Sequence, residues 1–88
     1  MSNEEYLEKA KELVKEYTEK KMRNRGEIPC IFETYIVWSC KTLQNSKALL
    51  STTMSDGMYY EVTYNGDKNE IYFDAYKKEE NRCIKMEE

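Results

Sequence analysis

The sequence predicts an α+β domain: one N-terminal amphipathic helix packed on one face of a four- to five-stranded antiparallel β-meander. Three observations support this. An apolar stripe with helical spacing occupies the first 25 residues, and the remainder alternates between apolar and polar side chains. Short segments rich in Gly, Asn and Asp separate the alternating runs, and turns this short join antiparallel neighbours. A length of 88 residues fits a single domain, residues 1–88.

The helix is expected over about residues 3–25. Ser2 and Glu5 fit a capping box, in which each side chain accepts a hydrogen bond from the other residue's backbone amide. Gly26 suits the left-handed conformation that often ends a helix. The side chains expected to face the sheet recur with a 3.6-residue period, and they are Tyr6, Leu7, Ala10, Leu13, Val14 and Tyr17.

The sheet is expected over about residues 30–87. Its strands are placed at 30–41, 47–54, 58–64 and 70–78, with a short edge strand at 82–86. A three-residue loop at 55–57 would place Leu50 opposite Val62, and a similar loop at 44–46 would place Cys40 opposite Leu50 and Trp38 opposite Thr52. The face that the helix covers is then expected to carry Phe32, Ile36, Trp38, Cys40, Leu50, Met54, Met58, Tyr60, Val62, Ile71 and Phe73.

The opposite face of the sheet is the main candidate for a binding surface, because tyrosine is enriched where proteins bind. By the same alternation it carries Tyr35, Val37, Lys41, Lys47, Leu49, Ser51, Tyr59, Glu61, Thr63, Tyr72, Asp74, Tyr76 and Lys77. The candidate ligand- or partner-binding residues are Tyr35, Lys41, Lys47, Tyr59, Glu61, Tyr72, Asp74 and Tyr76. The alternative is that tyrosine serves here only as a good strand former. Self-association through this face is also expected, because large apolar patches are uncommon on monomers.

A second candidate site is a basic cluster near the end of the helix, formed by Lys20, Lys21, Arg23 and Arg25. These cations are a candidate anion-binding site. A structural explanation also exists, since positive charge stabilises the negative end of the helix dipole.

Composition argues against several functions. With 14 Lys+Arg, 17 Asp+Glu and no His, the net charge is −3, so no direct binding of duplex nucleic acid is expected. No known catalytic motif is present, and the neighbouring carboxylates Glu61 and Asp74 lack a deep cleft, so we expect no enzyme and no cofactor. Cys30, Cys40 and Cys83 are an odd set without metal-ligand spacing, which favours reduced thiols and no metal. With no secretory signal or membrane span in sight, a cytoplasmic location and no membrane partner are expected.

The strand region resembles a family of short proteins encoded by phages of Gram-positive bacteria. The resemblance runs through Tyr35–Asn45 (YIVWSCKTLQN), Lys47–Thr52 (KALLST), Asp56–Asp67 (DGMYYEVTYNGD) and Tyr72–Lys78 (YFDAYKK). With the helix it covers most of the chain. It implies a phage protein that acts in the cytoplasm of the bacterial host, and it identifies no site residue.

A small phage protein without catalytic motifs is expected to act by binding. The function expected first is counter-defence by sequestering a nucleotide immune signal, with Trp38 and the tyrosines stacking on a base. Phosphate would then pair with Lys41, Lys47, Lys77 and Arg82. The alternatives are an inhibitor that binds a host defence protein, such as a CRISPR effector, and a phage accessory or structural protein. The expected partner is therefore a nucleotide-type small molecule or a host bacterial protein.

Overall fold

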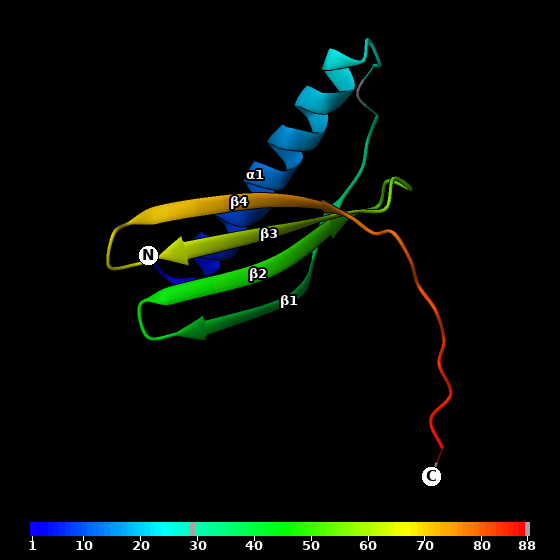
Figure 1. The fold of residues 1–88 in the computed structure, drawn as a ribbon. Coiled ribbons are helices and arrows are strands. Elements are labelled where there is room, and N and C mark those ends of the chain that lie inside the picture. Colours follow the sequence, from blue (N-terminus) through cyan, green and yellow to red (C-terminus); the bar gives the residue numbers. More distant parts are fainter. Residues whose placement is uncertain (29, 88) are drawn as a thin grey trace.

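The computed structural model describes residues 1–28 and 30–87, and it has one helix followed by four strands. The sheet is antiparallel throughout, and its strands lie side by side in chain order. Helix α1 lies behind this sheet in Figure 1 and runs diagonally across it, with its C-terminal end beyond β4. The expected α+β arrangement is confirmed. The elements are α1 (Asn3–Asn24), β1 (Thr34–Thr42), β2 (Asn45–Thr52), β3 (Met58–Asn65) and β4 (Glu70–Lys77).

Both ends of α1 are capped, the N-terminal end through one of the two hydrogen bonds of the expected capping box. The Ser2 hydroxyl accepts a hydrogen bond from the Glu5 backbone amide at 3.1 Å. At the other end, the amides of Arg25 and Glu27 donate to the Met22 carbonyl at 3.1 and 3.0 Å, and Gly26 has φ +75°. A side chain at Gly26 would be strained in this left-handed conformation. α1 is the only helix among the described residues, and it lacks the apolar length that crossing a membrane requires.

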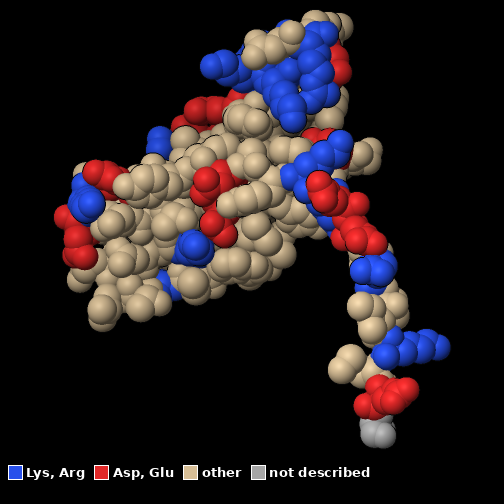
Figure 2. All heavy atoms as spheres, in the orientation of Figure 1, with Lys and Arg blue, Asp and Glu red and all other residues tan. Residues whose placement is uncertain are grey.

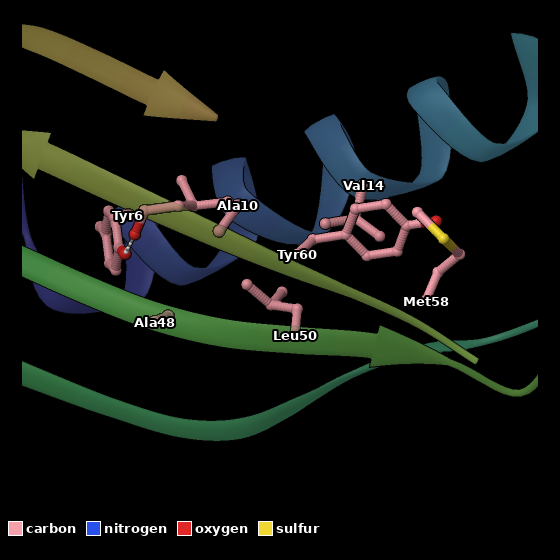
Figure 3. Packing of buried hydrophobic residues seen from close by; sticks show 8 residues of the cluster. Tyr6, Ala10, Val14, Ala48, Leu50, Met58 and Tyr60 are labelled. Carbon is pink, nitrogen blue, oxygen red and sulfur yellow. Dashed lines mark hydrogen bonds between the residues drawn. The ribbon is translucent and has the colours of Figure 1, made fainter. Parts of the chain in front are cut away.

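The core lies between α1 and the two central strands (Figure 3). Tyr6, Ala10 and Val14 of the helix pack against β2 and β3, where Leu50 and Tyr60 are fully buried. The helix then continues its buried stripe through Thr18 and Met22. Tyr17 contacts the sheet as expected, through Tyr60 and Phe73, although the fully buried row is the i, i+4 row from Tyr6 to Met22. Tyr17 lies at its border and is 37% exposed.

Strand β1 contains a β-bulge that changes which side chains face the helix. Ile36 pairs with Leu50, but the next pair is Trp38 with Leu49, so Val37 is the extra residue. Beyond the bulge the alternation is reversed. Trp38 and Cys40 therefore face away from α1, and their expected place in the core is wrong.

The first two hairpins have different registers from those expected, for different reasons. The β1–β2 turn is the two-residue Leu43–Gln44, with Leu43 at φ +55°, so Cys40 lies opposite Lys47 rather than Leu50. The connection between β2 and β3 spans residues 53–57, and Leu50 pairs with Tyr60. This second shift is two residues, an even number, so the faces of β2 and β3 are those expected.

The chain beyond β4 is not a strand. Residues 79–87 have no regular secondary structure and run away from the sheet (Figure 1). Ile84 and Met86 are 71% and 85% exposed. The edge strand expected at 82–86 is therefore wrong. The first strand also begins later than expected, because residues 30–33 lie outside it.

Candidate functional site

The face of the sheet that α1 leaves uncovered, hereafter the open sheet face, is built from rows of paired residues. One row is Tyr35, Ser51, Tyr59 and Tyr76, and the next is Trp38, Leu49, Glu61 and Asp74. A third row is Cys40, Lys47, Thr63 and Tyr72, and the last is Thr42, Asn45, Asn65 and Glu70. Each of the four strands contributes one residue to every row.

Aromatic side chains dominate the exposed part of this face. Tyr35, Trp38, Tyr72 and Tyr76 are each between 44% and 52% exposed, and Tyr59 is half-buried between its neighbours. Strand pairing places these rings over a rigid backbone, so a partner can contact them without first ordering a loop. Figure 2 shows this face as a largely uncharged surface with a few charged groups near its centre.

The charges on the open sheet face are mainly negative. Among the described residues it carries three carboxylates, Glu61, Glu70 and Asp74, and one ammonium group, Lys47, for a formal charge of −2. Lys47 Nζ lies 3.5 Å from Glu61 Oε1, so its charge is already paired. The Tyr72 hydroxyl donates to Glu70 Oε2 at 2.5 Å. This hydrogen bond, reinforced by the carboxylate's charge, raises the pKa of Tyr72 and keeps the phenol protonated.

One expected member of the site lies elsewhere. Lys41, which follows the bulge in β1, pairs with the buried Ser46 of β2 on the helix side of the sheet. Lys77 likewise pairs with the buried Met58 and lies on the helix side. Lys41 is therefore a wrong assignment to the open sheet face, for the same reason as Trp38 and Cys40. The other seven candidates, namely Tyr35, Lys47, Tyr59, Glu61, Tyr72, Asp74 and Tyr76, do share this face.

The carboxylates Glu61 and Asp74 are direct neighbours across β3 and β4. Asp74 is exposed, and Glu61 is paired with Lys47. A carboxylate pair suited to acid–base chemistry needs one member isolated from water and from cations. This pair therefore serves as negative surface charge.

The basic cluster of Lys20, Lys21, Arg23 and Arg25 is separate from the open sheet face. It gathers at the C-terminal end of α1 (Figure 2), and only Arg25 has a carboxylate partner, Glu27 at 3.7 Å, among the described residues. Lys20 and Lys21 share a surface groove with Tyr17 and Asn24. The fold thus separates an aromatic, acidic surface from a basic one.

The three cysteines are free and exposed, and they lie in three different parts of the chain. Cys30 precedes β1, Cys40 lies on the open sheet face, and Cys83 follows β4. Within residues 1–28 and 30–87, no three potential metal ligands among His, Cys, Asp and Glu come together.

Sequence reasoning missed six members of the open sheet face, namely Trp38 and Cys40 and the whole last row, Thr42, Asn45, Asn65 and Glu70. Trp38 and Cys40 depend on the bulge at Val37, and no glycine or proline in Tyr35–Lys41 marks that irregularity. The exposed fraction of Trp38, 44%, is visible only once the pairing is known.

Comparisons with known proteins identify a family without a known activity. No curated protein gives a significant match to the chain, and no solved structure does. A sequence model described as "Family of unknown function (DUF6275)" matches residues 7–86, which include nearly all of α1 and the whole sheet. The chain belongs to this family of unknown function, DUF6275.

Proposed function

We propose that this protein is a non-catalytic binding module that attaches its open sheet face to a basic surface of another protein. The observation that carries the proposal is the combination of exposed aromatic rings with a net negative charge on one rigid sheet face. The partner surface is expected to present Arg and Lys side chains.

The rings supply contact area and a way to hold cations. Tyr and Trp are among the residues that most often contribute large binding energies at interfaces. A guanidinium or ammonium group over an exposed ring gains about 0.5–1 kcal/mol, and more when water is excluded. Trp38 and Tyr76, on opposite edges of the sheet, supply two such rings.

The charge of the face favours a cationic partner over a phosphate-bearing one. The carboxylates Glu61, Glu70 and Asp74 repel phosphate, and Lys47 is already paired with Glu61. The same carboxylates attract Arg and Lys, which raises the association rate and selects against acidic partners.

The size of the face suits a protein partner. Four strands are roughly 19 Å across, and eight residues extend roughly 27 Å, which gives about 500 Å² before the relief of the side chains is counted. A stable protein interface buries about 800 Å² on each partner. The open sheet face with its rim approaches that size.

The resemblance to phage-encoded proteins supports a role for this binding inside a bacterial host cell. A basic patch is the electrostatic signature of a surface that binds nucleic acid. We therefore propose a host defence protein as the partner, with its nucleic-acid-binding surface covered by the open sheet face.

The test is co-purification from bacteria that produce the tagged protein. A partner should be retained by the parent chain and released as ionic strength rises. It should be lost from the Trp38→Ala/Tyr76→Ala variant, because this variant removes rings from both edges of the face. The recovered partner should lose its binding to DNA or RNA when the parent chain is added.

The matched control is Leu43→Ala/Ile84→Ala, which removes two highly exposed apolar side chains from outside the face. This control should retain the partner. Equal capture by the parent and the Trp38→Ala/Tyr76→Ala variant would overturn the proposal, as would a partner that is acidic where it contacts this chain.

A further inference from the structure

The C-terminal half of α1 has a groove in which an aromatic ring and two cations lie together. Its volume is about 250 Å³, and it is lined by Tyr17, Lys20, Lys21 and Asn24. These residues are spaced i, i+3, i+4 and i+7, so they form one stripe along the helix. All four lining residues belong to α1, and the groove is open to solvent.

Tyr17 is a partly exposed ring that packs against two rings of the sheet. Its centroid lies 5.6 Å from that of the buried Tyr60 and 5.3 Å from that of the partly buried Phe73. The side chain is 37% exposed and lines the groove. A supported aromatic ring of this kind is a platform on which a planar base can stack.

Lys20 and Lys21 are available to an anion. Within residues 1–28 and 30–87, neither ammonium group has a carboxylate within 4.0 Å. They follow Tyr17 by about one helical turn, which is roughly 5.4 Å along the axis. A ligand whose base lies on Tyr17 therefore reaches both ammonium groups with a phosphate attached through a sugar.

The negative end of the helix dipole does not prevent this. The Met22 carbonyl accepts hydrogen bonds from Arg25 and Glu27, and the Arg23 carbonyl accepts one from Gly26. The side chains of Arg23 and Arg25 add positive charge at the same end. The dipole explains why cations gather there, but it does not explain an exposed tyrosine in the same groove.

We infer that this groove binds a nucleotide, with its base stacked on Tyr17 and its phosphate paired with Lys20 and Lys21. The Asn24 side chain offers both a donor and an acceptor for the sugar or base. The volume lies just below the range of about 300–1,000 Å³ usual for drug-sized ligands, which favours a mononucleotide. The site is independent of the open sheet face.

The experiment is an NMR titration of the full chain with AMP, adenosine and ribose 5-phosphate as separate probes. AMP should shift the amide signals of residues 17–24 with a Kd below about 1 mM, and each half-ligand should bind about tenfold more weakly. Lys20→Gln/Lys21→Gln should weaken AMP about tenfold and leave adenosine unchanged. Tyr17→Leu, which keeps an apolar side chain over Phe73, should weaken adenosine.

The control Lys9→Gln/Lys68→Gln makes the same change of charge outside the groove and should bind AMP like the parent. The inference is overturned if AMP shifts no signal at about 1 mM. It is also overturned if the shifts map to the open sheet face, or if Lys20→Gln/Lys21→Gln binds AMP as tightly as the parent. A folded amide spectrum for each variant separates lost binding from lost structure.

Discussion

Tyr6 connects the helix to the centre of the sheet through its hydroxyl. The side chain is 1% exposed, and the hydroxyl donates to the Val62 carbonyl at 2.5 Å. Burial is the main reason that the pKa of Tyr6 is raised to about 12, because a phenolate is costly away from water. The protonated form is therefore part of the native structure.

We expect Tyr6→Phe to lower the free energy of unfolding by about 1–1.5 kcal/mol at pH 8, because the Val62 carbonyl loses its buried donor. The raised native pKa also gives a sign to the pH dependence. The stability that the protonated Tyr6 hydroxyl contributes is complete below pH 10, the pKa of tyrosine in the unfolded chain. It is lost as the pH rises toward the native pKa of about 12. Urea unfolding at pH 8 and pH 11 should show a smaller alkaline loss in the variant. A loss equal to the parent's would mean that Tyr6 does not titrate with unfolding.

Trp38 and Leu50 distinguish the two faces of the sheet. Leu50 is fully buried, so Leu50→Ala should cost about 2–5 kcal/mol of unfolding free energy. Trp38 is 44% exposed beyond the bulge, so Trp38→Ala should cost less than about 1.5 kcal/mol, as expected for a surface position. Urea midpoints of the two variants test this difference. If Trp38→Ala were as unstable as Leu50→Ala, Trp38 would have to lie in the core.

At the scale of secondary structure, the sequence predicted elements better than registers. Ser2, Glu5 and Gly26 are local signals, and they set the ends of α1. Alternation gave the faces of β2, β3 and β4, because an even shift in register preserves them. The bulge at Val37 has no local signal, since it depends on how β1 pairs with β2. For the same reason, Lys41 was expected on the open sheet face but lies on the helix side.

The bulge predicts that deletion of Val37 is tolerated. Removing Val37 should leave the pairs Ile36–Leu50 and Trp38–Leu49 in place, because Val37 has no partner of its own in β2. We expect the deletion to keep the fold, as judged by its amide spectrum and a lowered but cooperative thermal transition. Deletion of Thr63 in the central strand β3 is the control. It should abolish folding, because every residue on one side of the gap changes face. Equal damage from both deletions would contradict the bulge.

At the scale of the whole molecule, charge is divided between two surfaces. The net charge of −3 is the sum over surfaces of opposite sign. The C-terminal end of α1 is basic, and the open sheet face has a formal charge of −2. Composition alone predicted neither, because the separation depends on which lysines the bulge and the helix place on each side. The tyrosines and Lys47 of the open sheet face were predictable from strand parity, whereas Trp38 and Lys41 were misplaced because of the bulge.

Self-association through the open sheet face stays a prediction, and the charge of the face adds a condition. Two copies meeting face to face bring like charges together, so salt should promote the dimer by screening them. Light scattering at high micromolar concentration should give the monomer mass of 10.6 kDa at about 0.01 M NaCl and a larger mass at about 1 M. The Trp38→Ala/Tyr76→Ala variant should remain monomeric at both. A parent mass of 10.6 kDa at both ionic strengths would contradict this prediction.

The distribution of the three free thiols gives this protein its own set of footprinting labels. Cys40 reports on the open sheet face, Cys30 on the segment before β1, and Cys83 on the chain after β4. All three are exposed, so a maleimide reacts with each of them in the isolated protein. A partner seated on the sheet would slow alkylation at Cys40 alone, and peptide mass mapping would read that protection without any engineered residue.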